Sequence, residues 1–251
     1  MVYSQFVVEV KLKREDVPSF DAYPFSLPAV RYLDSLPFHP SVTFFVGENG
    51  TGKSTLLEAI AVAYGFNAEG GSRSFRFSTQ ASHSELHKYL RISRGVRKPK
   101  TGWFFRAESY YNVATEIDRR DEGLSFDPPI RTYYGGISLH RQSHGESFMS
   151  LLLHRFSASG LYILDEPEAA LSPTHQIAAL ARIHQLAQGG AQLIIATHSP
   201  ILMSYPCAAI LMLGDHGIEQ VEYESTDHFR TTRDFLTNYS SILDKLMNNS
   251  R

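Results

Sequence analysis

Short apolar runs recur along the last third of the chain. Residues 161–164 and 193–196 are continuously apolar, which is typical of strands buried on both faces. Residues 208–213 and 218–223 predict two further strands, and the pattern over 227–247 predicts a helix. Strands that alternate with helices favour a parallel sheet, so the pattern predicts the α/β class.

A helix is expected between the first two of these strands. Ser172 followed by Pro173 is typical of an N-cap with proline at the first helical position, and Gly189 predicts the end. Helical spacing places four apolar residues on one face: Ile177, Leu180, Ile183 and Ala187. Such an apolar face is typical of an amphipathic helix.

The first two thirds of the chain mix shorter elements with loops. Alternation over residues 2–12 predicts a strand with Val8 on the same side as Phe6 and Val10, and the aromatic run at 101–107 predicts another. Residues 81–92 predict a short helix. Three stretches that are polar or rich in proline, glycine or serine are expected to be mostly loop: 16–40, 65–80 and 118–132. Within the first of them, residues 31–34 suggest a short helical turn.

A glycine-rich loop stands between the apolar run 42–46 and the helix-like run 56–63. It fits the pattern G-x-x-x-x-G-K-[ST], and it reads Gly47-Glu48-Asn49-Gly50-Thr51-Gly52-Lys53-Ser54-Thr55. A strand, a glycine loop and a helix in that order are the context that confirms a phosphate-binding P-loop.

The residue types in this loop suit phosphate chemistry. Backbone N–H groups must point at phosphate oxygens, and glycines permit the necessary curvature and close approach. Lys53 is expected to reach the β- and γ-phosphates and Ser54 to ligate Mg²⁺. The rest of the loop is expected to contact the nucleotide: Gly47, Asn49, Gly50, Thr51, Gly52 and Thr55.

Bulk composition narrows the class of protein. The 251 residues suit one large domain or two small ones, and 43% hydrophobic content allows a globular core. No apolar run approaches the ~20 residues that span a bilayer, and the first residues lack a signal-peptide pattern, so we expect a cytoplasmic protein without membrane insertion. The single cysteine, Cys207, excludes an internal disulfide and a cysteine metal cage.

Two adjacent carboxylates follow the apolar run 161–164. Asp165 is expected at the carboxyl end of a buried strand, where α/β sheets bind ligands, and it would hold the Mg²⁺. Glu166 would polarise an attacking water. This pair has the form of a Walker B element, although an isolated Asp-Glu at a strand end also occurs where a strand simply meets solvent.

Further motifs follow the order used by ATP-binding-cassette (ABC) ATPases. Residues 142–147 resemble the signature sequence, 169–172 resemble the D-loop, and 196–200 end a strand with His198 in the place of the switch histidine. The chain therefore resembles ABC ATPases over about 42–213. Its Asp-Glu-Pro-Glu and Thr-His-Ser-Pro elements most resemble the head-type group, which includes SMC and RecF relatives and small stand-alone ATPases.

This resemblance implies a fold and a domain organisation. It implies a P-loop NTPase of the α/β class with a mostly parallel central sheet, an N-terminal antiparallel β portion and a small helical arm lobe. Residues 1–251 would form one ATPase domain, with a core of about 1–66 and 150–251 and an inserted lobe of about 67–149.

The resemblance also implies a mechanism that uses ATP and Mg²⁺. Two copies would form a homodimer, in which the signature of one subunit caps ATP on the P-loop of the other. The signature residues that would bind nucleotide are Ser143, Gly145 and Glu146. The catalytic residues that it implies are Lys53, Glu166 and His198.

The chain departs from the family pattern at several positions. In the signature, His144 stands where glycine is commonest and Glu146 where glutamine is commonest. The glutamine that senses the γ-phosphate has no clear equivalent, so Arg106, Glu108 and Gln80 are the candidates. An aromatic residue that stacks on adenine is also unassigned, and its candidates are Tyr23, Phe25 and Tyr32, each of which also suits the core.

Other functions share parts of this pattern. A nucleotide-binding subunit of a membrane transporter has the same chemistry, and an ATP-gated interaction module would bind nucleotide without hydrolysing it. A nucleotide kinase also carries a P-loop, but the signature element and His198 argue against it. The sequence leaves the first two alternatives open beside the head-type ATPase.

A basic run lies between the P-loop and the signature. It contains five cations and no acid: Arg91, Arg94, Arg97, Lys98 and Lys100. With a net charge of −2 the chain has no general attraction to nucleic acid, so any such binding must come from this run. We expect it to be a docking surface for a partner protein rather than for nucleic acid.

Overall fold

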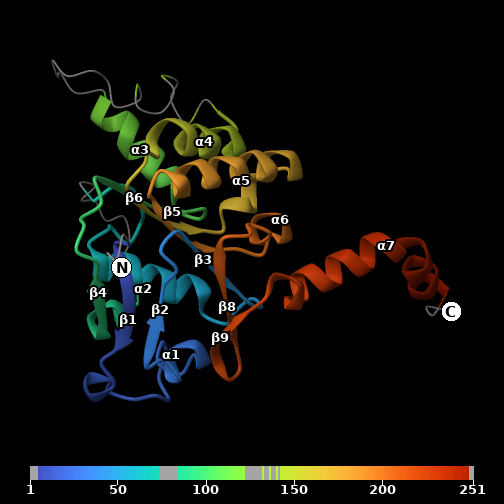
Figure 1. Cartoon of the computed structure of the whole chain (residues 1–251), viewed down its shortest axis with the longest axis horizontal. Helices are drawn as coiled ribbons and strands as arrows, with labels where there is room; N and C mark the ends of the chain where they lie inside the picture. Colours follow the sequence, from blue (N-terminus) through green and yellow to red (C-terminus); the bar gives the residue numbers. More distant parts are fainter. Residues whose placement is uncertain are drawn as a thin grey trace.

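The computed structural model describes residues 5–73, 84–121, 132, 136, 140 and 142–248. Its centre is a six-stranded sheet with the order β5-β6-β7-β3-β8-β9 (Figure 1). All neighbours are parallel except β8 and β9. The strands are β3 (Val42–Val46), β5 (Thr101–Arg106), β6 (Gly160–Asp165), β7 (Gln192–Ala196), β8 (Ala208–Gly214) and β9 (Gly217–Val221). The mostly parallel sheet is thus confirmed.

A second, antiparallel sheet of three strands uses the N-terminal segment. Its order is β2-β1-β4, with β1 at Val7–Leu12, β2 at Ser35–Pro37 and β4 at Leu90–Arg94. This confirms the predicted antiparallel portion. The register between β1 and β4 shifts between Val7 and Glu9, so Val8 is only half-buried while Val7 and Val10 are buried.

Helices and helical turns connect the strands. The α-helices are α1 (Pro28–Arg31), α2 (Lys53–Tyr64), α3 (Tyr110–Asp121), α4 (His144–Ser150), α5 (Pro173–Gln188), α6 (Pro200–Met203) and α7 (Asp227–Asn248). The shorter turns are η1 (Arg14–Asp16), η2 (Glu85–Tyr89), η5 (Leu151–Arg155), η6 (Pro167–Ala170) and η7 (Tyr223–Ser225). α7 extends away from the rest of the molecule (Figure 1), and none of its residues is buried.

Alternate residues of the central strands pack on opposite faces of the sheet. Phe44 and Tyr162 belong to a core that includes residues of α3, α4 and α5, whereas Phe45 and Ile163 belong to a core formed with α2 and the small sheet. Successive side chains of a strand point to opposite faces, so each strand contributes to both cores. This explains why the strand sequences are continuously apolar.

Three local predictions are wrong. Residues 81–92 do not form one helix, because η2 ends at Tyr89 and β4 begins at Leu90, where pairing with β1 determines the conformation. Residues 118–121 are the last turn of α3 rather than a loop. Ile177 does not share the buried face of α5, since it is 60% exposed while Ala179, Ile183 and Leu186 are the buried residues of this helix.

The proposed inserted lobe of about 67–149 remains a prediction. Within it, β4 pairs with β1 and β5 pairs with β6, so these two strands belong to the two sheets. α3 and α4 pack together on one face of the central sheet (Figure 1). Among the described residues, no helix is both long and apolar enough to cross a membrane.

Candidate functional site

The carboxyl ends of three neighbouring parallel strands meet at one edge of the central sheet. Asp165 at the end of β6 pairs with Ala196 at the end of β7, and Ala196 pairs with Phe45 of β3. The segments that follow these strands carry the P-loop, Glu166 and His198. Ligands of open α/β sheets bind at this edge, so the sheet topology brings the predicted residues together.

Positive φ angles at three glycines shape the P-loop. Gly47, Gly50 and Gly52 have φ of 145°, 84° and 93°, which side-chain-bearing residues rarely adopt. A Cβ at Gly47 would also lie 2.4 Å from the carbonyl oxygen of Leu213. Thr51 closes the loop by donating to the carbonyl of Glu48 at 2.9 Å. The backbone therefore requires glycine at these positions.

Lys53 lies folded against its own loop. Its Nζ donates to the carbonyls of Gly47 and Glu48, both at 2.8 Å, and its side chain is buried. Burial lowers the pKa of Lys53, while the carboxylates of Glu166 and Asp165 oppose that shift. An ammonium held at the start of a helix, beside loop N–H groups, suits a polyphosphate ligand.

Ser54 and Asp165 place two hard oxygen atoms together. Ser54 Oγ donates to Oδ1 of Asp165 at 3.0 Å. Burial raises the pKa of Asp165 to about 6, and the hydrogen bond from Ser54 and the charge of Arg106 oppose the rise. A hydroxyl and a carboxylate are the ligands that Mg²⁺ takes from protein when phosphates and water supply the rest, so this pair fits the ion.

Glu166 adopts a left-handed backbone conformation. Its φ and ψ are 49° and 53°, an arrangement that costs energy for a residue with a side chain. Its N–H donates to the carbonyl of Ala196 at 3.0 Å, which ties the turn to β7. The side chain is 44% exposed, and its Oε1 lies 3.8 Å from Nε2 of His198. Glu166 thus reaches out of the strand end toward His198 and remains accessible to water.

His198 is held on two sides. Its backbone N–H donates to Oε1 of Glu168, and its Nδ1 lies 3.0 Å from Nε2 of His228 in the first turn of α7. Its own Nε2 is buried and has no hydrogen-bond partner within the part of the chain that the structure describes. Burial, and then the charge of Lys53, lowers the pKa of His198. The ring is therefore neutral at pH 7, with one nitrogen left for a ligand.

Two comparisons of the sequence agree with this geometry. A family model described as "AAA domain" matches residues 27–131, and one described as "AAA domain, putative AbiEii toxin, Type IV TA system" matches residues 130–204. A "Putative ribose/galactose/methyl galactoside import ATP-binding protein" from Albidiferax ferrireducens is 27% identical over 69% of this chain and 37% of its own length. The chain is therefore similar to P-loop ATPases of the ABC type.

Two further similarities are more distant. The "ABC transporter G family member STR2" of Medicago truncatula is 23% identical over 63% of this chain and 24% of its own length. An SMC head bound to the C-winged helix domain of ScpA shares 13% identity, with a TM-score of 0.43 over 74% of this chain and 92% of that one. The chain thus spans about a third of the length of the first of these curated relatives and about a quarter of the length of the second.

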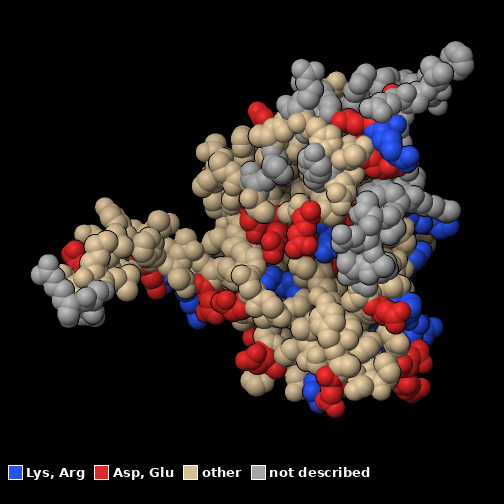
Figure 2. Space-filling model, turned by 180° about the vertical axis from the view of Figure 1, so that it is seen from behind, with Lys and Arg blue, Asp and Glu red and all other residues tan. Residues whose placement is uncertain are grey.

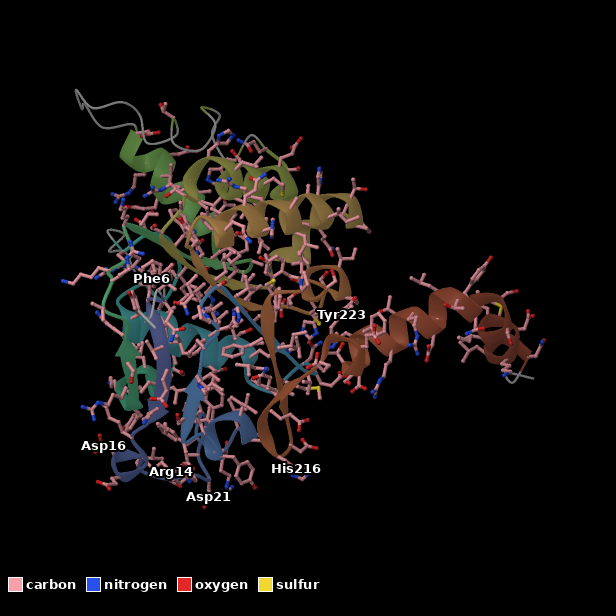
Figure 3. All side chains as sticks on the ribbon, viewed as in Figure 1. Phe6, Arg14, Asp16, Asp21, His216 and Tyr223 are labelled. Atoms are coloured by element: carbon pink, nitrogen blue, oxygen red, sulfur yellow. The ribbon has the colours of Figure 1, made fainter. Side chains whose placement is uncertain are left out.

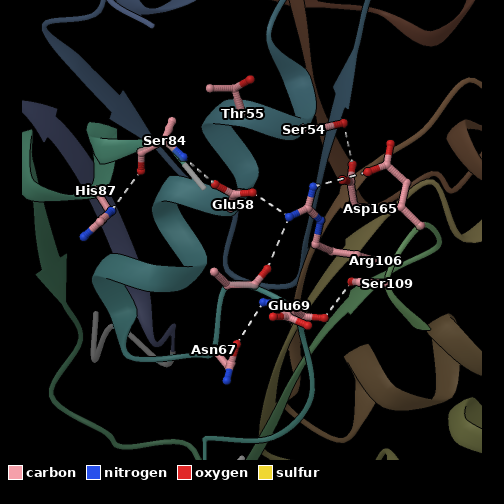
Figure 4. A network of polar contacts seen from close by, with 12 residues as sticks. Ser54, Thr55, Glu58, Asn67, Glu69, Ser84, His87, Arg106, Ser109 and Asp165 are labelled. Atoms are coloured by element: carbon pink, nitrogen blue, oxygen red, sulfur yellow. Dashed lines mark hydrogen bonds and ion pairs between the residues drawn. The ribbon is translucent and has the colours of Figure 1, made fainter. Parts of the chain in front are cut away.

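Arg106 connects the P-loop helix to the strand end (Figure 4). Its guanidinium donates to Oε2 of Glu58 on α2 at 2.5 Å and to the carbonyl of Ala68 at 3.2 Å, and it lies 3.5 Å from Glu108. Arg106 is largely buried, whereas the Glu108 side chain is 87% exposed. Of the three candidates for the γ-phosphate sensor, these two lie near Asp165, and Gln80 lies outside the described residues.

The signature residues lie at the start of α4. Ser143 is its N-cap, and it forms a capping box in which Ser143 N and Oγ donate to Oε2 of Glu146 while Oγ accepts from Glu146 N. Ser143 and Gly145 line a cleft of about 430 Å³ with Glu166 of the same subunit. The Ser143 hydroxyl thus has a structural partner within its own subunit, which the spacing Ser-x-x-Glu signals in sequence.

The adenine-stacking candidates separate by exposure. Phe25 is buried and packs edge-on against Tyr89, so it is a core residue. Tyr23 is 65% exposed, and its hydroxyl lies 3.2 Å from Oγ1 of Thr55 in the P-loop helix. Tyr32 is 59% exposed and lies against Gly217 on β9. Tyr23 is therefore the candidate nearest the phosphate loop.

Sequence reasoning missed Glu168 and His228, the two residues that hold His198. Glu168 is partly buried, and desolvation by burial raises the pKa of its carboxyl group. Glu168 follows Glu166 by two residues, so the sequence did signal an additional carboxylate close to the Asp165–Glu166 pair. His228 had no such signal, because its contact with His198 arises only when η7 and α7 return to the site.

Proposed function

We propose that the protein binds ATP with Mg²⁺ and hydrolyses it. The observation that carries this proposal is the convergence of Lys53, Asp165 and Glu166 on one edge of the sheet, beside the buried free nitrogen of His198. Figure 2 shows acidic and basic side chains side by side near the middle of one face of the molecule. Such juxtaposed charges suit a metal-bound polyphosphate.

Each residue would take one part of the chemistry. Lys53 leaves the loop carbonyls and binds β- and γ-phosphate oxygens. Ser54 and Asp165 would hold Mg²⁺, which would neutralise charge on the phosphates. Glu166 accepts a proton from the water that attacks the γ-phosphate, and Nε2–H of His198 donates to an oxygen of that phosphate.

We further propose that hydrolysis occurs in a homodimer. Two features support it: the order of the family motifs, and a signature segment that begins at an exposed N-cap, Ser143. In a head-to-tail pair, Ser143 and the start of α4 would face the γ-phosphate of the other subunit. Closure would exclude water and complete the site, as lids do.

The test is ATP turnover by the purified protein. Phosphate release should require Mg²⁺, and Lys53→Ala should abolish both ATP binding in calorimetry and phosphate release. Lys100→Ala, which changes an exposed lysine in the basic run, is the matched control and should behave as wild type. Absence of ATP binding would refute the proposal, whereas tight binding without turnover would favour the non-hydrolysing interaction module.

A transporter subunit is the second candidate. Similarity to an import ATP-binding protein favours it, whereas the Asp-Glu-Pro-Glu and Thr-His-Ser-Pro elements favour the head-type group. Fractionation of cells that carry the native protein separates the two. A transporter subunit should sediment with membranes and leave them only with detergent, and a head-type ATPase should remain in the supernatant.

A further inference from the structure

The base of α7 is fixed to the segment that carries His198. Tyr223, which lies where α7 leaves the body (Figure 3), donates to the carbonyl of Pro200 at 2.8 Å. Its ring packs 4.7 Å from that of Phe229, and the buried Thr226 caps the helix by accepting from Phe229 N. These contacts place His228, the second residue of α7, against His198.

The contact between the two imidazoles restricts where their protons can lie. A hydrogen bond between Nδ1 of His198 and Nε2 of His228, 3.0 Å apart, needs a proton on one nitrogen and a lone pair on the other. Burial lowers the pKa of both rings, so both are neutral near pH 7. Two arrangements then remain, and they differ in which ring donates.

The surroundings of His198 favour one of these arrangements. Its Nε2 faces Oε1 of Glu166 at 3.8 Å. If His198 donated from Nδ1, its Nε2 would carry a lone pair toward a carboxylate and toward phosphate oxygens. If His228 donates instead, Nε2 of His198 carries the proton and can donate to these anions. The hydrogen bond made by one ring nitrogen sets the protonation of the other.

We propose that His228 is a positioning residue that donates to Nδ1 of His198 and so keeps the proton of His198 on Nε2. This inference rests on the proposed function, because the γ-phosphate of ATP is the acceptor that the Nε2–H would meet. It also connects α7 to the reaction, since a displacement of its first turn withdraws the donor. The segment of α7 beyond that turn lies away from the body, where a partner can reach it (Figure 1).

The proton position can be measured directly in the protein without nucleotide. Long-range ¹H–¹⁵N spectra of histidine-labelled protein distinguish the two neutral tautomers, and the His198 signals are assigned by their loss in His198→Asn. We expect wild-type His198 to be protonated on Nε2 alone. A wild-type His198 protonated on Nδ1 would overturn the proposal, and this measurement needs no altered His228.

Two matched substitutions then test the donor. The amide nitrogen of glutamine occupies roughly the place of histidine Nε2, whereas that of asparagine corresponds to Nδ1 and is too short to reach. His228→Gln should keep the Nε2–H tautomer of His198, and His228→Asn should give a mixture of both. His154→Gln, at an exposed histidine of η5, is the control for labelling and folding. An unchanged tautomer in His228→Asn would overturn the proposal.

Turnover provides the second readout. We expect His228→Asn to lower kcat about 10- to 100-fold with little change in KM, the scale seen when a residue that orients a functional ligand is lost. His228→Gln should restore most of the turnover. If the protein hydrolyses no ATP, the proposed function fails, while the tautomer measurement still tests whether His228 donates to His198. If turnover is normal in His228→Asn, the positioning role fails while the ATPase assignment stands.

Discussion

Ser54 Oγ donates a 3.0 Å hydrogen bond to Oδ1 of Asp165, although 111 residues separate the two along the chain. The bond joins the first turn of α2 to the end of β6. It brings two metal-ligating oxygens together before a metal arrives, so little rearrangement is needed for Mg²⁺ to bind between them. The ionised carboxylate that this requires is buried, and burial opposes its ionisation.

The ionised carboxylate of Asp165 should therefore destabilise the folded protein when no ligand is bound. The pKa of Asp165 is about 6 in the folded protein and 3.8 otherwise, so its ionisation destabilises the folded state. This destabilisation is complete above pH 6 and absent at pH values well below 4. Asp165→Asn should stabilise the protein by about 3 kcal/mol at pH 8 and by about half of that at pH 5, since one pKa unit is about 1.4 kcal/mol.

Urea unfolding without nucleotide and magnesium measures this difference. Asp21→Asn, at an exposed carboxyl group that Figure 3 labels, is the control and should have little effect. With Mg²⁺ and ATP the wild type should become the more stable of the two proteins, because ligand binding stabilises the wild type and not Asp165→Asn. An Asp165→Asn protein that is no more stable at pH 8 than wild type would contradict the prediction.

Glu166 should be required for turnover but not for binding. Its exposed carboxylate lies beyond the end of β6 and close to His198, where it can accept a proton from water. Glu166→Gln keeps the shape and removes the base, so turnover should fall at least about 100-fold while ATP affinity persists. Glu15→Gln, on the exposed turn η1, is the control. Equal steady-state rates for Glu166→Gln and wild type would eliminate Glu166 as the base.

Ser143 should be needed for ATP-dependent association. In light scattering, Glu166→Gln with Mg²⁺ and ATP should have the mass of a dimer, and an added Ser143→Arg should return it to a monomer because the larger side chain blocks the facing phosphate. Ser172→Arg, at the exposed N-cap of α5, tests whether losing any helix cap has the same effect. If no protein changes mass with ATP, the nucleotide sandwich is incorrect.

The motifs of the site could be predicted because their chemistry is local in sequence. Glycines with positive φ shape the P-loop, and Asp165 directly follows a continuously apolar strand. The alternation of strands and helices then predicts that these segments meet at one sheet edge. Parallel strands bring their carboxyl ends together, so the order of the elements alone implies this meeting.

Other features depend on contacts that no local pattern encodes. Leu90 pairs with Leu12 of β1, and this distant partner makes residues 90–94 a strand although the predicted helix extended to residue 92. His228 meets His198 only because the β8–β9 hairpin and η7 return the chain to the switch segment. Tertiary pairing overrides local preference at the first position and creates a functional contact at the second.

Duplex DNA should bind weakly or not at all at physiological salt, with or without ATP. The basic run is on the surface, but Arg94 is already used, since it donates to the carbonyl of Tyr64 at 3.1 Å and stacks on the Tyr64 ring. The net charge of −2 adds no attraction to a polyanion. If all five cations met phosphates, the logarithm of affinity would fall with a slope of about −4 to −5 against the logarithm of salt concentration.

Fluorescence anisotropy across a salt series measures this slope, with a protein in which Arg94, Arg97 and Lys98 are changed to Glu as the comparison. Submicromolar, salt-sensitive binding that disappears in that variant would show that the basic run docks nucleic acid rather than a protein.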